Sequence, residues 1–247
     1  GLGHFPPLLL MGMRFVLAAF LLAWFVPLPR GHFWTLCWIS FIAATLQYGL
    51  TFSGLALMAA TPAVLLVQSE VIFGVIIAAI LLGERPSLRQ ILGIVMASCG
   101  VVVILGAPAL KGQWLGIGLV LSGALVWAFG QVLIRRLDGA LGGFQLTAWI
   151  GVMAGPQMLL ASCLIDGNPL PAIQAAPIEA WLTVIYLGVV MTAIGYSAWY
   201  YVLARYPVPM VMPVLLLLPV AAIFGAVTML GEVPDPMVLA GGMVVIF

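Results

Sequence analysis

Charged residues are scarce in this chain. Only 6% of its 247 residues are Asp, Glu, Lys or Arg, and eight basic side chains against seven acidic ones leave a formal net charge of +1. A protein that binds nucleic acid needs a basic patch that this composition does not supply. The sequence therefore argues against a nucleic-acid partner.

Groups for catalysis and metal binding are also few. His4 and His32 lie in different loops, and no Walker A loop, Asp-rich diphosphate motif or Gly-x-Ser-x-Gly motif occurs. Cys37, Cys99 and Cys163 lie in apolar blocks without ligand spacing, so we expect them to be small buried hydrophobic residues. We expect no enzyme activity, no metal site and no cofactor.

Hydrophobic residues, in contrast, make up 65% of the chain and give a mean hydropathy of +1.28. They form blocks of about 20 residues, the length of a helix that crosses about 30 Å of hydrocarbon. Helices also satisfy their own backbone polar groups in lipid. The sequence therefore predicts an all-α integral membrane protein. Nine segments are expected, at residues 6–27, 33–57, 60–82, 88–106, 114–136, 144–165, 180–204, 209–230 and 236–247.

The charges that remain are divided between the two sides of the expected membrane. Threading the segments alternately through the bilayer places six arginines on one side, and one lysine with four acidic residues on the other. Lys and Arg concentrate in cytoplasmic loops, so the arginine side is expected to face the cytoplasm. The arginines are Arg30, Arg85, Arg89, Arg135, Arg136 and Arg205, and the opposite group is Lys111, Asp166, Glu179, Glu232 and Asp235.

The chain also contains an internal repeat. A shift of 148 residues superposes Leu82-Gly83-Glu84 on Leu230-Gly231-Glu232 and Tyr48 on Tyr196. In the threading above, the two glutamates fall on opposite sides, which predicts two repeats of inverted topology. Secondary transporters are often built this way, with the substrate site at the repeat interface. We expect a first repeat over 1–106, a periplasmic linker over 107–113 and a second repeat over 114–247.

Symmetry between the repeats predicts more spans than the chain contains. Segment 114–136 has no counterpart in the first repeat, and segment 236–247 is too short to cross a bilayer. The expected complete architecture is a bundle of ten helices, five in each repeat. Relative to that bundle, the first span is missing here and the last is truncated.

Two ionisable residues fall inside expected spans. Arg14 and Glu70 both lie about 12 Å below the outer end of their spans, at about 1.5 Å per residue. Each costs about 2.5–3.5 kcal/mol on insertion scales, so each needs a reason to be there. They could form an ion pair that only locks two helices together, or Glu70 could face a cavity and bind an amine or a proton. Burial favours the neutral carboxyl and a guanidinium favours the carboxylate, so the sequence leaves the protonation state open.

Six further residues are candidates for lining a substrate cavity. Gln68 and Tyr48 offer amide and hydroxyl groups, which can orient a zwitterion without the cost of burying a full charge. The others are Trp127 and Gln131 on one helix face, and Tyr196 and Trp199 on another. An aromatic wall could hold an ammonium group by cation–π attraction. Ordinary packing and interhelical hydrogen bonding are the alternative for all six.

Three motifs carry a family resemblance. They are Phe5-Pro6-Pro7-Leu8-Leu9-Leu10-Met11-Gly12-Met13-Arg14-Phe15, Leu81-Leu82-Gly83-Glu84-Arg85-Pro86 and Leu218-Pro219-Val220. The first resembles the opening of the second span in the EamA family of the drug/metabolite transporter superfamily. The second is similar to the LLGE signature that closes the fourth span of that family, and the third to its ninth-span proline.

The resemblance implies a carrier of the bacterial inner membrane with ten helices in two inverted repeats and both termini of the complete protein in the cytoplasm. Relatives in this family export amino acids, other metabolites or drugs. Phosphorylated substrates favour several intramembrane cations, and only Arg14 qualifies here, so a zwitterion or cation is the expected substrate.

We therefore expect export of amino acids or close derivatives by alternating access. Glu70 is the candidate group for sensing a substrate amine or a proton. The alternatives are a polyspecific drug exporter and a membrane scaffold that transports nothing. The expected partners are a small-molecule substrate and the lipid bilayer. The sequence leaves the oligomeric state open, and a monomer is compatible with it.

Overall fold

The computed structural model describes residues 4–58, 63, 66–105, 112–137 and 139–218, and every regular element within these residues is a helix. The chain divides into two compact units. Unit 1 contains Gly1–Gly49 and Leu133–Arg205, and unit 2 contains Leu50–Val132 and Tyr206–Phe247. Each unit therefore takes segments from both predicted repeats.

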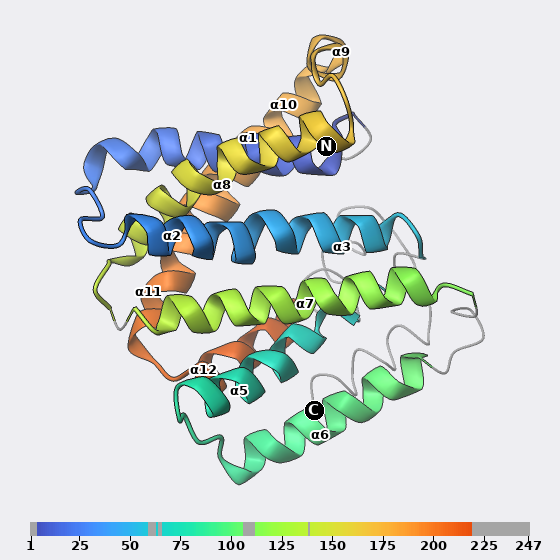
Figure 1. The fold of residues 1–247 in the computed structure, drawn as a ribbon, viewed down its shortest axis with the longest axis vertical. Coiled ribbons are helices and arrows are strands. Elements are labelled where there is room, and N and C mark those ends of the chain that lie inside the picture. The colour runs from blue at the N-terminus through green and yellow to red at the C-terminus, as the bar shows by residue number, and fades with distance from the viewer. Residues whose placement is uncertain (1–3, 59–62, 64–65, 106–111, 138, 219–247) are drawn as a thin grey trace. The chain divides into compact units, whose positions relative to one another are not determined.

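Apart from α9, which no predicted segment contains, the described helices follow the predicted apolar segments up to residue 218 (Figure 1). The α-helices are α1 (Pro7–Leu22), α2 (Phe33–Ser40), α3 (Gln47–Leu55), α5 (Ser69–Leu81), α6 (Leu88–Leu105), α7 (Trp114–Arg135), α8 (Gly143–Ile165), α9 (Leu170–Ala175), α10 (Ile178–Tyr186), α11 (Ser197–Arg205) and α12 (Val208–Val211). Two short 3₁₀ segments, η1 (Ala23–Phe25) and η5 (Met212–Leu217), and two π-helical segments, η2 (Phe41–Leu46) and η4 (Leu187–Tyr196), complete the list. Segment 236–247, all of 219–230, and Lys111, Glu232 and Asp235 lie outside the described residues.

Five of the described helices are long and apolar enough to cross a membrane, which confirms the predicted all-α membrane architecture. They are Pro7–Phe25, Phe33–Leu55, Trp114–Arg135, Gly143–Ile165 and Ile178–Arg205. Large apolar side chains are exposed along them, among them Trp24 (77%), Trp34 (74%) and Trp38 (63%) near span ends. Exposed tryptophans at such positions are typical of a membrane interface.

One cysteine differs from expectation. Cys163 is exposed and Cys37 is half-buried, so the predicted burial is wrong for Cys163. A thiol behaves as a small hydrophobe and has no need of a protein core when the solvent at that face is lipid.

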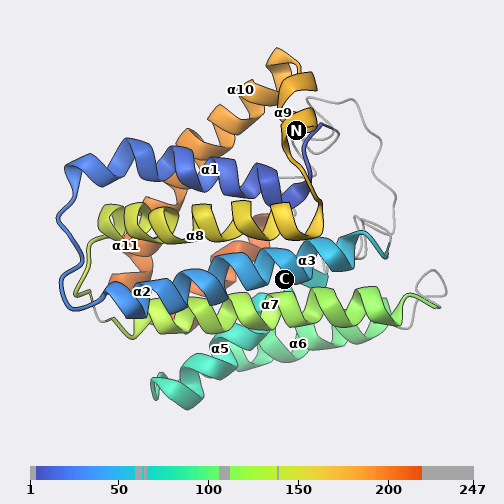
Figure 2. The ribbon, with the colours of Figure 1, turned by 45° about the horizontal axis from the view of Figure 1, so that its top comes forward.

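In unit 1, α1 and α8 pack closely and run in opposite directions (Figure 2). Gln145 Nε2 and Trp149 Nε1, at the start of α8, both donate to the carbonyl of Pro27 beyond the end of α1, at 3.0 and 2.9 Å. Glycines make the close approach possible, because a Cβ on Gly151 would lie 2.9 Å from the backbone oxygen of Phe15.

The other two long spans of unit 1 also run in opposite directions. The span α2–η2–α3 begins at the end of the unit where Pro27 lies. The span α10–η4–α11 begins at the other end, where the rings of Phe5 and Trp181 lie 5.6 Å apart. At its last turn, the carbonyl of Ala204 accepts a hydrogen bond from Arg135 Nη1 at 2.7 Å. Both reversals are what the predicted inversion requires of these spans.

The π-helical segments were not predicted. Shifted by 148 residues, η2 (41–46) falls on 189–194, inside η4 (187–196). In η4 the buried hydroxyl of Thr192 donates to the carbonyl of Leu187, five residues earlier, at 2.8 Å. A π-helical turn accommodates one extra residue and is frequent at functional sites. Corresponding spans of the two predicted repeats thus share the same irregularity.

In unit 2, α5 packs against α12 and η5. Glu84 Oε2 accepts a hydrogen bond from the backbone N–H of Val208 at 2.6 Å, and Gln90 Nε2 donates to the carbonyl of Pro209 at 2.7 Å. The predicted span 60–82 is interrupted, because Gln68 lies in a turn and α5 begins at Ser69. A small core joins residues after α3 to α7 and consists of Met58, Ala63, Leu66, Ile117 and Val120.

Candidate substrate site

A buried arginine lies at the centre of a polar cluster in unit 1. Arg14, on α1, is 7% exposed, and its Nη2 donates to the hydroxyl of Tyr48 on α3. The hydroxyl oxygens of Tyr48 and Tyr196 lie 3.2 Å apart, within hydrogen-bond distance. These two tyrosines are 148 residues apart, so the residues that the repeat aligns meet each other in space.

Aromatic rings surround the guanidinium. Its central carbon lies 4.9 Å from the ring centroids of Phe15 and Tyr48 and 5.9 Å from that of Tyr196. The ring of Tyr200 extends the group, 5.6 Å from Tyr196. Cation–π attraction is worth about 0.5–2 kcal/mol per ring. The three rings therefore offset much of the cost of burying this cation.

No carboxylate among the described residues of unit 1 pairs with Arg14. Asp166 accepts a hydrogen bond from Ser162 at 2.8 Å, and Glu179 is exposed. The Nε of Arg14 is buried and has no hydrogen-bond partner among the described residues. The expected Arg14–Glu70 ion pair would join the two units and stays a prediction. Within its own unit, Arg14 is a buried cation whose hydrogen-bonding neighbours are neutral phenols.

The remaining predicted site residues are buried or half-buried. In unit 2, Gln68 and Glu70 are each 7% exposed, Gln68 in the turn before α5 and Glu70 in its first turn. On α7, Trp127 is 8% and Gln131 1% exposed. Trp199, on α11, is half-buried. None of these side chains is exposed as Trp38 (63%) is, as a cavity-lining role requires.

The structure brings together Arg14, Tyr48 and Tyr196 from the predicted set. Sequence reasoning missed Phe15 as a member of the cluster, although it directly follows Arg14. The contact between Tyr48 and Tyr196 had a signal in the sequence, which is their alignment by the 148-residue shift. In the predicted inverted repeat, aligned residues of the two copies can meet only near the axis that relates the copies.

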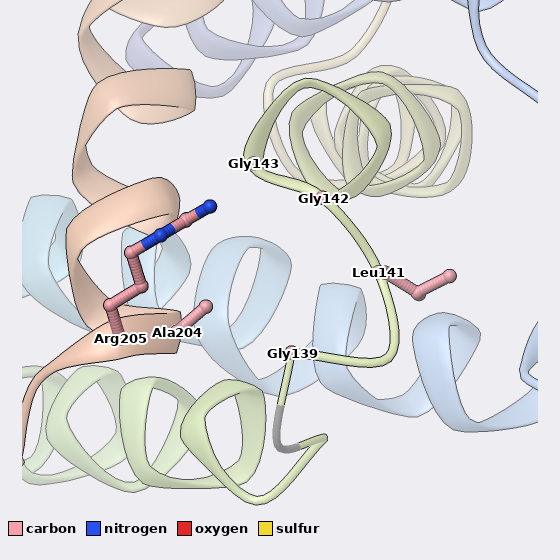
Figure 3. A pocket seen from close by; sticks show the side chains of 6 residues that line it. All are labelled: Gly139, Leu141, Gly142, Gly143, Ala204 and Arg205. Carbon is pink, nitrogen blue, oxygen red and sulfur yellow. The ribbon is translucent and has the colours of Figure 1, made fainter.

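A hollow of about 270 Å³ lies at one end of unit 1, lined by Gly139, Leu141, Gly142, Gly143, Ala204 and Arg205. Figure 3 shows Arg205 reaching from α11 toward the start of α8. The Arg205 guanidinium stacks 3.4 Å from the Tyr201 ring centroid and donates to the Tyr201 carbonyl at 3.1 Å. This hollow lies outside the Arg14 cluster, at the loop that joins α7 to α8.

Comparison with known proteins decides the family. The chain matches the EamA-like transporter family over residues 1–106 and 114–247. It belongs to this family. The match confirms the predicted resemblance, and an EamA-like chain with these apolar helices is a multi-pass membrane protein of a transporter family.

Some relatives of this EamA-like chain carry names that refer to export. It is 31% identical over 254 residues to a "Probable amino-acid metabolite efflux pump" of Salmonella typhimurium, with 99% of this chain and 85% of the relative covered. It is 32% identical over 180 residues to a "Probable terminal-alkyne amino-acid exporter" of Streptantibioticus cattleyicolor, covering 72% and 59%. A protein of known crystal structure shares the fold, with a TM-score of 0.75, 21% identity and coverage of 98% and 85%.

Proposed function

We propose that this chain is an exporter of the bacterial inner membrane that moves amino acids or close derivatives by alternating access. The observation that carries the proposal is the cluster of Arg14, Tyr48 and Tyr196, which places a cation and two hydroxyls among apolar spans. Polar groups at such positions are costly and mark substrate pathways. The relatives whose names refer to amino-acid export support the same substrate class.

Several features of unit 1 support two inverted repeats as the moving parts. Corresponding spans run in opposite directions, their π-helical segments coincide under the 148-residue shift, and Tyr48 meets Tyr196. Inverted repeats that rock about a central site are a common construction of secondary transporters.

The arginines of unit 1 support a cytoplasmic assignment for one of its ends. Arg135 bonds to Ala204, and Arg205 shares a hollow with the loop that leads into α8. Gln145 of α8 bonds in turn to Pro27, in the loop that carries Arg30. Positive charge gathered at one end is the pattern of a cytoplasmic face.

A flux screen tests the proposal. The purified protein is reconstituted in liposomes, and radiolabelled amino acids are competed against one another with and without a pH gradient. We expect saturable flux for a subset of amino acids. Absence of flux for every amino acid and derivative, from protein that is folded in the same liposomes, would favour the scaffold alternative.

The polyspecific drug exporter makes a different prediction for Trp127. In an amino-acid exporter, Trp127→Ala should lower flux about three- to tenfold for every substrate, because a stacked aromatic contributes about 0.5–1.5 kcal/mol beyond its buried area. In a polyspecific exporter, the change should instead shift the range of substrates. The control is Trp38→Ala, which removes an exposed tryptophan and should leave both flux and range unchanged.

A further inference from the structure

We propose that Arg14 is the residue that binds the carboxylate of the substrate, with the hydroxyls of Tyr48 and Tyr196 as additional donors. The inference rests on the proposed function and assigns one chemical group of the substrate to one side chain. It predicts that the carboxylate is the recognised anion and that substrates without it are discriminated against.

The hydrogen bonding of Arg14 is incomplete. A guanidinium carries five N–H donors in a planar fork that matches the two oxygens of a carboxylate. Here Nη2 donates to the phenol of Tyr48, and the buried Nε has no partner among the described residues. A neutral hydroxyl is a weaker partner for a cation than a carboxylate is. The site therefore has unused capacity for an anion.

Geometry prepares the guanidinium for such a ligand. The rings of Phe15, Tyr48 and Tyr196 lie 4.9–5.9 Å from its central carbon and limit its movement. A donor that is held in place before binding loses little conformational entropy when the ligand arrives. A purely structural arginine would gain more from a carboxylate of its own unit, and neither Asp166 nor Glu179, the carboxylates of unit 1 that the structure describes, pairs with Arg14.

The two tyrosines link binding of the substrate carboxylate to two of the long spans. Tyr48 lies two residues after the end of the π-helical segment η2, and Tyr196 is the last residue of η4. Their hydroxyls lie 3.2 Å apart, and Arg14 donates to the hydroxyl of Tyr48. A carboxylate that accepts from Arg14 and from both hydroxyls would replace this contact between two oppositely directed spans. Binding of the carboxylate would then change a contact made by both spans.

The experiment compares competitors that differ only at the carboxylate. For a substrate found in the flux screen, inhibition by the free amino acid is measured against inhibition by its amide and by the corresponding decarboxylated amine. For the wild-type protein we expect the acid to compete about 10- to 100-fold better, since hydrogen bonds to a charged group are the strong ones. Equal competition by acid and amine would overturn the assignment and leave the exporter proposal intact.

Variants then locate the discrimination. Arg14→Gln should reduce the preference for the acid to within about twofold, and Arg14→Lys should restore only part of it because an ammonium lacks the fork. Should Arg14→Gln fail to fold, Tyr48→Phe tests the proposal instead. This variant keeps the ring, removes the hydroxyl, and should lower the preference for the acid severalfold. The matched control is Arg205→Gln, which replaces an arginine at the end of unit 1. This variant should keep the preference for the acid. An unchanged preference in Tyr48→Phe and in every folded Arg14 variant would refute the proposal, whereas absence of wild-type flux would refute the function itself.

Discussion

Gly143→Ser should prevent unit 1 from assembling correctly, whereas Gly142→Ser should leave the protein folded. A Cβ on Gly143 would collide with the carbonyl oxygen of Ser197 and would lie 2.8 Å from the backbone nitrogen of Tyr201. Both obstacles are backbone atoms of α11, so no side chain can rotate away. Overpacking in cores typically costs about 1–3 kcal/mol, and a clash with backbone belongs at the upper end of that range.

The neighbouring glycine is the matched control. Gly142 is the N-cap of α8, with φ −69° and ψ 158°, and nothing lies within 4 Å of its added Cβ. Serine is a favourable N-cap residue. In Figure 3 the two glycines stand side by side at the start of α8. The measurement is the yield of monodisperse protein in detergent and its melting temperature. Equal yield and melting temperature for both variants would contradict the packing shown here.

Glu70→Gln should remove the pH dependence of transport. Glu70 is 7% exposed in the first turn of α5. Glutamine keeps the shape of the side chain but cannot exchange a proton, and carboxyls inside membranes are common members of proton relays. We expect wild-type flux to change between about pH 5 and pH 8, and the variant's flux to be lower and independent of pH.

Glu179 provides the control for this experiment. It also lies in the first turn of a helix, α10, but it is exposed at a span end. Glu179→Gln should therefore leave the pH profile unchanged. The measurement is liposome flux at fixed substrate across the pH range, with expression levels compared among the three proteins. Identical profiles for wild type and Glu70→Gln would remove Glu70 from the transport mechanism.

The long spans could be predicted because their physical cause is local. Blocks of apolar residues bounded by Pro27, Arg30 and Asp166 fix where helices cross, whatever their neighbours are. The π-helical segments could not be predicted, because their side chains are as apolar as those of an ordinary span. The turn at Gln68 was missed for a similar reason, since no glycine or proline marks it.

The candidate site was only partly within reach of the sequence. Depth within a span identified Arg14 as buried, and equal depth suggested Glu70 as its partner. The neighbours that the structure gives to Arg14 are Phe15, Tyr48 and Tyr196, which come from three helices. Which helices pack together depends on glycine contacts such as Gly151 with Phe15, and those contacts become visible only in three dimensions.

The meeting of Tyr48 with Tyr196 also bears on how such a chain could have arisen. One such origin is a gene of half the present length, whose product inserted in both orientations and paired with itself. A single tyrosine would then touch its own copy across a twofold axis, as residues do in isologous dimers. Duplication and fusion would free each copy to diverge, and an arginine such as Arg14 could then be kept on one side alone.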